Sequence, residues 1–167
     1  RCSRDWSSDV CSSDLEGLNF SADVRSDSAA LNGLTERLLL EVGDIHVLRD
    51  PTRGGLATTL NEIAVQSQVS ICIDETAVPI LPTVRTVCEM LGFDPLYVAN
   101  EGKLIAIVPP DELPAALSAL RAHPYGAQAA HIGTVQSQDP GRVLLRTQIG
   151  GTRLLDKLAG EMLPRIC

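Results

Sequence analysis

Residues 46–64 read HVLRDPTRGGLATTLNEIA, and they hold the clearest structural signal of the chain. It begins with a short apolar segment at residues 46–48 and continues into a turn that holds one proline and two adjacent glycines. Apolar residues then recur every three to four positions over residues 56–64, which is the spacing of an amphipathic helix. The sequence therefore predicts a strand, a glycine turn and a helix in direct succession.

Helical and strand patterns take turns on both sides of this unit. Gly43 and Gly92 stand where the C-terminal caps of two helices belong, and Asp111, after two prolines, is placed to cap a further helix. We expect helices at residues 31–42, 56–64, 81–91 and 113–120, and strands at residues 46–48, 69–74, 103–108, 131–135 and 143–146. This order predicts an α/β (α+β) fold with a mixed β-sheet covered by helices.

Composition limits the possible functions. The chain has 167 residues, of which 44% are hydrophobic and 21% charged, which is typical of one globular domain. Its formal net charge of -7 and the lack of a basic stripe argue against nucleic-acid binding. The longest apolar runs fall far short of a membrane span. Five cysteines without a C-x-x-C pair favour reduced thiols and a cytoplasmic protein.

The two ends of the chain differ from its middle. Residues 1–15 are rich in serine and show no periodicity, so we interpret them as a foreign or mistranslated leader; a genuine disordered N-terminus is the alternative. Residues 16–158 form the predicted domain. Residues 159–167 contain Gly160 and Pro164 and are expected to form a mobile tail that ends in a reactive cysteine.

The turn at residues 50–55 is a candidate phosphate site. Helix N-termini attract anions, glycines let a backbone approach a ligand closely, and an arginine suits phosphate oxygens. The residues concerned are Asp50, Thr52, Arg53, Gly54 and Gly55. The Walker spacing is absent, and a helix start without any ligand is the competing interpretation.

Glu101 is a candidate general base. It lies between Asn100 and Gly102 at the start of an apolar strand, where it could face a cleft. Partial burial would make such a carboxylate a stronger base. The alternative is a solvated glutamate that pairs with Lys103.

Cys167 is the last residue of the chain, and Arg165 lies close by. At ~3.3–3.6 Å per residue, residues 159–166 give its thiol a reach of roughly 25–30 Å. The thiolate is the nucleophilic form, and the adjacent terminal carboxylate disfavours it, so an activating partner is needed. The alternative is that the chain merely happens to end at a cysteine.

The three histidines show no metal-ligand spacing, and we expect no metal site in this chain.

A family resemblance combines these motifs. Along the chain stand Asp50-Pro-Thr-Arg-Gly-Gly-Leu-Ala-Thr, Tyr97-Val-Ala-Asn-Glu-Gly-Lys, Gly150-Gly-Thr-Arg and the terminal Pro164-Arg-Ile-Cys. In this order they closely resemble the C-terminal half of the HypE family of hydrogenase maturation proteins, which are carbamoyl dehydratases. The resemblance covers residues 16–167. The glycine turn alone also suits other members of the aminoimidazole ribonucleotide synthetase superfamily.

The resemblance implies a defined chemistry. Cys167 would receive a carbamoyl group from a HypF-type carbamoyltransferase, and ATP would drive dehydration of this group to a thiocyanate. The cyanide would pass to the iron of a nickel–iron hydrogenase precursor through a HypC–HypD-type scaffold. Glu101 matches the family's catalytic glutamate, and the residues 50–55 turn would face ATP phosphates or the tail. The resemblance also gives supporting roles beside these site residues to Asn100, Lys103 and Arg165.

Length is the main departure from the family, whose members are about twice as long. The N-terminal half, with much of the ATP and Mg²⁺ site and the main homodimer contacts, would be absent, so we expect a truncated form that is inactive alone. Two other functions stay open. One is an ATP-dependent synthetase of a small phosphorylated metabolite, and the other is a non-catalytic carrier module that only presents the tail.

Overall fold

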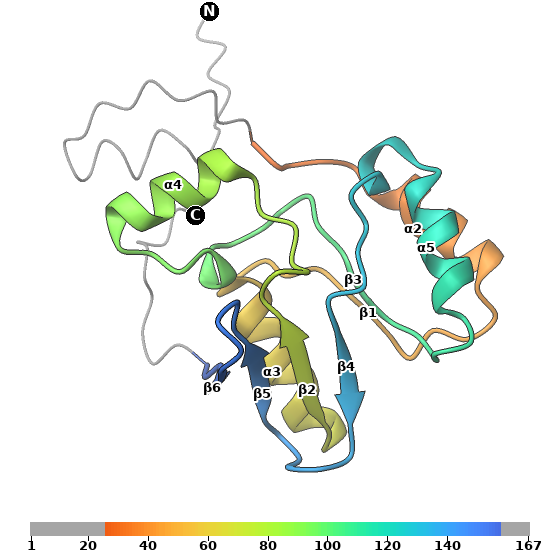
Figure 1. Cartoon of the computed structure of the whole chain (residues 1–167). Coiled ribbons are helices and arrows are strands. Elements are labelled where there is room, and N and C mark those ends of the chain that lie inside the picture. Colours follow the sequence, from red (N-terminus) through yellow and green to blue (C-terminus); the bar gives the residue numbers. More distant parts are fainter. Residues whose placement is uncertain (1–25, 158–167) are drawn as a thin grey trace, which may run out of the picture.

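The computed structural model describes residues 26–157 (Figure 1). Helices and strands alternate along most of this part of the chain, as the sequence pattern predicts. The helices are α2 (Asn32–Glu41), α3 (Gly55–Ser67), α4 (Pro82–Leu91) and α5 (Leu113–Arg121), with short 3-10 helices η1 (Pro95–Tyr97) and η2 (Pro124–Gly126). The strands are β1 (Val47–Arg49), β2 (Ser70–Asp74), β3 (Ile105–Ile107), β4 (Gly133–Gln136), β5 (Val143–Arg146) and β6 (Thr152–Leu154).

A four-stranded mixed sheet forms the larger half of the described structure. Its strand order is β4-β2-β5-β6, with β2 parallel to β5 and both other pairs antiparallel. Helix α3 lies along one face of this sheet (Figure 1). Alternate residues of β2 and β5 point at the helix and are almost fully buried: Ile71, Ile73, Val143 and Leu145. Burial of this face is the main force that holds α3 against the sheet.

Strands β1 and β3 form a separate antiparallel ladder, in which Val47 pairs with Ile107 and Arg49 pairs with Ile105. Successive side chains of a strand point to opposite faces. Val47 and Ile107 accordingly pack against the core beneath α3, whereas Leu48 and Ala106 pack against a second core. The ladder is therefore a partition between two hydrophobic clusters.

The second cluster lies between this ladder and the helix pair α2 and α5, which lie side by side in Figure 1. Leu38 is fully buried at its centre, with Val42 and Ala116 around it. Helix α4 stands apart and contacts η1, with Cys88 as its one buried residue. None of the helices in residues 26–157 is long and apolar enough to cross a membrane.

The mixed α/β fold is confirmed, with three differences of detail. The helix that ends before Gly43 closes in extended backbone at Val42, so Gly43 does not serve as a left-handed cap, in contrast to Gly92. Asp111 does not cap α5, because that helix starts at Leu113 without a side-chain cap. The strands divide into two sheets and include an additional strand, β6, because strand pairing depends on contacts distant in sequence.

Candidate functional site

The glycine turn leads into α3 as predicted. Gly54 is the N-terminal cap of the helix and has a φ of 72°, a left-handed conformation that favours glycine. A side chain at Gly54 would overlap the hydroxyl of Thr58 one turn later. That hydroxyl is buried without a hydrogen-bond partner among the described residues. Arg53 is exposed. The turn thus presents a helix N-terminus and a guanidinium to its surroundings.

Gly55 allows a close approach within the chain itself. A Cβ atom at this position would lie 2.5 Å from the carbonyl oxygen of Val98 and 2.7 Å from that of Leu96. The N–H of Asn100 also donates to the carbonyl oxygen of Pro51 at 3.1 Å. These contacts join the start of α3 to the loop that carries Glu101. The turn and the glutamate, predicted as separate motifs, are therefore held together.

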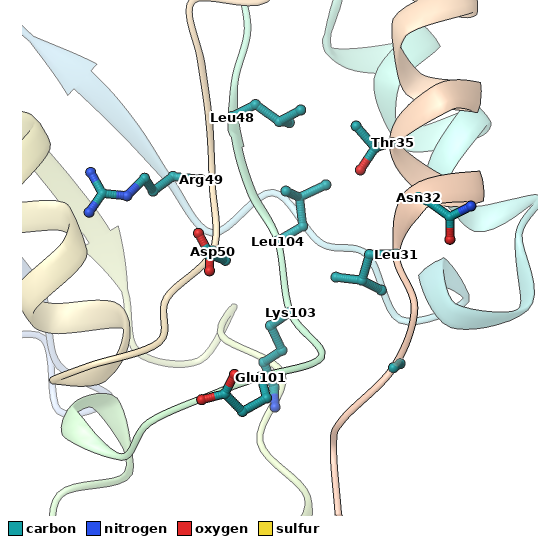
Figure 2. A pocket seen from close by; sticks show the side chains of 10 residues that line it. Leu31, Asn32, Thr35, Leu48, Arg49, Asp50, Glu101, Lys103 and Leu104 are labelled. Atoms are coloured by element: carbon teal, nitrogen blue, oxygen red, sulfur yellow. The ribbon is translucent and has the colours of Figure 1, made fainter. Parts of the chain in front are cut away.

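Glu101 lines a hollow of about 340 Å³ whose walls come from three parts of the chain (Figure 2). Asp50 lies at the end of β1, Lys103 and Leu104 precede β3, and Leu31 to Thr35 belong to the start of α2. Figure 2 shows Arg49 directed away from the hollow towards α3, where it forms an ion pair with Glu62 at 3.0 Å. The hollow therefore has two carboxylates, those of Asp50 and Glu101, and its other lining side chains are of mixed polarity.

The proposed pairing between Glu101 and Lys103 is wrong. The Lys103 ammonium instead contacts the carboxylate of Asp27 at 2.8 Å. Glu101 is exposed and makes no hydrogen bond or ion pair with any residue of the described part of the chain. Its carboxylate is thus available to a group that enters the hollow. The burial expected for a strong general base is not provided by residues 26–157.

Residues 26–31, here called the strap, were not anticipated as part of the site. The strap crosses Gly102 so closely that a side chain there would overlap the carbonyl oxygen of Asp27. The Asp27–Lys103 ion pair lies at the same crossing. Ala29 and Leu31 then form one wall of the hollow. No local pattern could have revealed this wall, because the contact joins residues far apart in sequence.

Asn100 has a structural role in the described residues. Its side-chain amide donates to the carbonyl oxygen of Val98 at 2.8 Å, while its main-chain N–H donates to the carbonyl oxygen of Pro51.

Tyr97 precedes this loop. Burial is the main cause that raises the pKa of its phenol, and the nearby Asp94 carboxylate is the second. The phenol of Tyr97 therefore stays protonated at neutral pH and can donate a hydrogen bond.

Two predicted site residues, Arg165 and Cys167, lie outside the described residues.

The rest of the described structure offers little further ligand chemistry. Within residues 26–157, His, Cys, Asp and Glu side chains form no group of three or more that could hold a metal ion. A smaller hollow of about 210 Å³ lies beside Cys72 and Arg146 on the sheet face opposite α3. Neither feature adds a second site of comparable definition.

Comparison with known proteins identifies the class. Residues 8–146 match the family described as AIR synthase related protein, C-terminal domain. The chain therefore belongs to this family, and the resemblance inferred from its motifs is confirmed. The match begins at residue 8, and the leader boundary at residue 15 stays a prediction.

Within this family the chain is similar to HypE. It is 55% identical over 152 residues to the carbamoyl dehydratase HypE of Cupriavidus necator, covering 91% of this chain and 43% of that protein. The corresponding protein of Escherichia coli K12 is 40% identical, with 44% of its length covered. The chain thus spans less than half the length of these curated relatives.

Solved structures agree with this relationship. A crystal structure of the hydrogenase maturation protein HypE superposes with a TM-score of 0.86 at 59% identity, covering 93% of this chain and 50% of that one. A HypE structure in complex with ATP gives a TM-score of 0.85, with 93% of this chain and 48% of that one covered. The crystal structure of a HypE–HypF complex gives a TM-score of 0.81 at 41% identity, covering 88% of this chain and 48% of that one.

Proposed function

We propose that this chain is the C-terminal part of an ATP-dependent carbamoyl dehydratase that makes cyanide ligands for nickel–iron hydrogenase. One observation carries the proposal: the unpaired Glu101 carboxylate faces a hollow of about 340 Å³ and is joined through Asn100 and Pro51 to the glycine turn. A base and an anion-binding turn are two of the elements that this reaction requires. The likeness to HypE supports the same assignment.

The reaction converts the thiocarbamate on Cys167 to a thiocyanate. The S–C(=O)–NH₂ group loses its oxygen and both nitrogen protons, and the carbon–nitrogen bond becomes a triple bond. ATP, when bound, supplies the phosphoryl group that turns the amide oxygen into a leaving group and finally carries it away as phosphate. Glu101 accepts one proton from the amide nitrogen, and the second proton passes to solvent as the carbon–oxygen bond breaks. The sulfur of Cys167 keeps its bond to carbon throughout.

The turn at residues 50–55 fits an anion, but it does not form a complete nucleotide site. Backbone N–H groups at the start of α3 and the exposed Arg53 provide positive potential. Asp50 lines the same hollow as Glu101 and is a candidate group for orienting the incoming amide. We assign Mg²⁺ and most ATP contacts to the part of HypE that this chain does not cover.

The partners follow from the same assignment. The relative solved in complex with HypF supports a HypF-type carbamoyltransferase as the donor of the carbamoyl group. A HypC–HypD-type iron scaffold would accept the cyanide, and the complete protein would act as a homodimer in the cytoplasm. Arg165 would help to place Cys167 against these partners.

Mass spectrometry of Cys167 tests the function. The chain, joined to the uncovered part of a HypE relative, is incubated with HypF, carbamoyl phosphate and ATP. We expect one carbamoyl group on Cys167 and then loss of one water. A carrier module would keep the carbamoyl group unchanged, and a metabolite synthetase would not acquire it.

Glu101→Gln should slow the water loss by about 10²–10⁴-fold, the usual contribution of a general base, and leave carbamoylation intact. Glu89→Gln, an exposed carboxylate on α4, is the matched control. Equal dehydration rates in both variants would exclude Glu101 as the base.

A further inference from the structure

The segment that precedes the last ten residues is firmly attached to the domain. Leu155 follows β6 and is fully buried in the core under α3. Its N–H donates to the carbonyl oxygen of Val143 at 2.8 Å. Burial of a leucine contributes about 1.5–3 kcal/mol, so this residue anchors the chain strongly. Everything after Lys157 therefore starts from one defined place.

Two side chains hold the carbonyl groups of this segment. The amide of Asn61 on α3 donates one hydrogen to Leu155 at 2.7 Å and the other to Ala57 at 2.9 Å, which fixes its orientation. The phenol of Tyr97 donates to the carbonyl oxygen of Asp156 at 2.8 Å. Lys157 adds only an ion pair with Glu62 at 3.5 Å, which is partly exposed and contributes little.

The motif Gly150-Gly-Thr-Arg explains how the chain reaches this position. Gly150 has a φ of 85° and turns the chain back, and the N–H of Thr147 closes the turn on the carbonyl oxygen of Gly151 at 2.8 Å. Arg153 then donates to the carboxylate of Asp94 at 2.7 Å, just before η1. The motif is therefore a hairpin that attaches β6 to the η1 segment.

The attachment points lie outside the hollow but on elements that pack against the candidate site. Tyr97 ends η1, whose backbone packs against Gly55 at the start of α3, and Asn100 on the same loop binds Pro51. Asn61 lies two turns along α3 from that start. The origin of the last ten residues, the glycine turn and the loop of Glu101 are thus parts of one packed unit.

We propose that Asn61, Tyr97 and Arg153, here called the root clamp, are positioning residues that fix where the cysteine-bearing segment begins relative to Glu101. This inference rests on the proposed function, since it gives Cys167 a cargo to deliver. The clamp residues contact neither the cargo nor ATP; they act by holding the main chain of residues 155–157.

The number of residues between the root clamp and Cys167 sets how strongly the clamp affects delivery of Cys167 to Glu101. With the clamp closed, the segment that carries Cys167 consists of residues 158–167. If the clamp and β6 opened completely, it would consist of residues 147–167, roughly twice the length. Effective concentration falls about as the −3/2 power of length, so delivery to Glu101 would drop about threefold. The end-to-end distance would widen about 1.5-fold, as the square root of length.

Distance measurement tests the clamp without any catalysis. Spin labels are placed on Cys167 and on a cysteine at the exposed position Gln66, with the other cysteines except the buried Cys88 replaced by serine. We expect the triple variant Asn61→Ala, Tyr97→Phe, Arg153→Ala to broaden the distance distribution, by less than the 1.5-fold limit because Leu155 stays buried. An unchanged distribution would overturn the proposal.

Activity provides the second readout. In the chain joined to the part of HypE that it does not cover, the triple variant should dehydrate its own carbamoylated Cys167 more slowly, by less than the threefold limit because Leu155 and the pairing of β5 with β6 remain in place. Its rate on a free carbamoylated peptide of residues 158–167 should stay unchanged, because a free peptide does not use the clamp. Equal losses on both substrates would mean that the substitutions damage the site itself, and the proposal would be wrong.

Tyr125→Phe is the matched control, since Tyr125 is exposed and distant in sequence from the clamp. It should change neither the distance distribution nor either rate. If the unsubstituted protein dehydrates neither substrate, the proposed function fails, and the spin-label distances still decide whether the clamp exists.

Discussion

Gly55 is the residue at which the turn and the Glu101 loop depend on each other. We predict that Gly55→Ala destabilises the chain by about 2–5 kcal/mol. About 1–2 kcal/mol comes from its left-handed backbone, with φ at 63°, and the remainder from overlap of the new methyl group with Leu96 and Val98. Urea unfolding followed by circular dichroism measures the loss.

Gly92→Ala separates these two causes. Gly92 caps α4 with a φ of 72°, but a Cβ there would meet no atom within 4 Å. This variant should lose only about 1 kcal/mol, the backbone contribution alone. If both variants lose the same stability, the close approach at Gly55 has no energetic weight.

Asp74 provides a pH-dependent prediction at the end of β2. The hydroxyl and the N–H of Thr76 donate to its carboxylate at 2.6 and 2.9 Å, and these hydrogen bonds lower the pKa of Asp74 below 3.8. A lowered pKa means that the contribution to stability is present above pH 3.8 and is lost as the pH falls through the lower, folded-state value.

Thr76→Ala removes the larger of the two causes and should raise the pKa of Asp74 towards 3.8. Carboxyl chemical shifts in an NMR titration report it directly. Thr134→Ala, on the neighbouring strand β4, removes a hydroxyl that does not bind Asp74 and serves as the control. An unchanged titration in Thr76→Ala would contradict the assignment of cause.

The individual elements were largely predictable, because their signals are local. Residues 143–146 form a strand with the predicted bounds, and Gly92 ends α4 as expected. The pairing of Lys103 with Asp27 was not predictable, since the nearest acidic residue in sequence is Glu101. Local sequence identifies helices, caps and turns, whereas it contains no information on which distant segment crosses a given glycine.

The strap is the element whose position depends most on contacts that local sequence does not reveal. We predict that Gly102→Ala releases residues 26–31, because its methyl group would occupy the position of the Asp27 carbonyl oxygen. Faster hydrogen exchange and proteolysis should appear in these residues, with little change elsewhere.

Lys103→Met is the control for the strap. It removes only the partly exposed ion pair with Asp27, which is worth about 0–1 kcal/mol, so the strap should stay in place. Equal release in both variants would show that the ion pair, and not the close crossing, holds the strap.

The described residues form two hydrophobic cores, which the β1–β3 ladder separates. Val47 and Leu48 are neighbours in sequence and lie in different cores, as do Ala106 and Ile107. The hollow of Glu101 opens along the same ladder, between α2 and the glycine turn (Figure 2). Relative motion of the two cores would therefore change the width of the candidate site, so the site requires the cores to behave as one cooperative unit.

Leu38→Ala tests this cooperativity. Leu38 is fully buried in the second core, so its truncation should cost about 2–5 kcal/mol. Because β1 and β3 belong to both cores, we expect the slowest-exchanging amides of α3 and β2 to lose as much protection as those of α2. Leu40→Ala on the same helix, where the side chain is 78% exposed, should change protection by less than about 0.5 kcal/mol. A loss confined to α2 and α5 would mean that the ladder separates two independent units, and a rigid site between them could not be maintained.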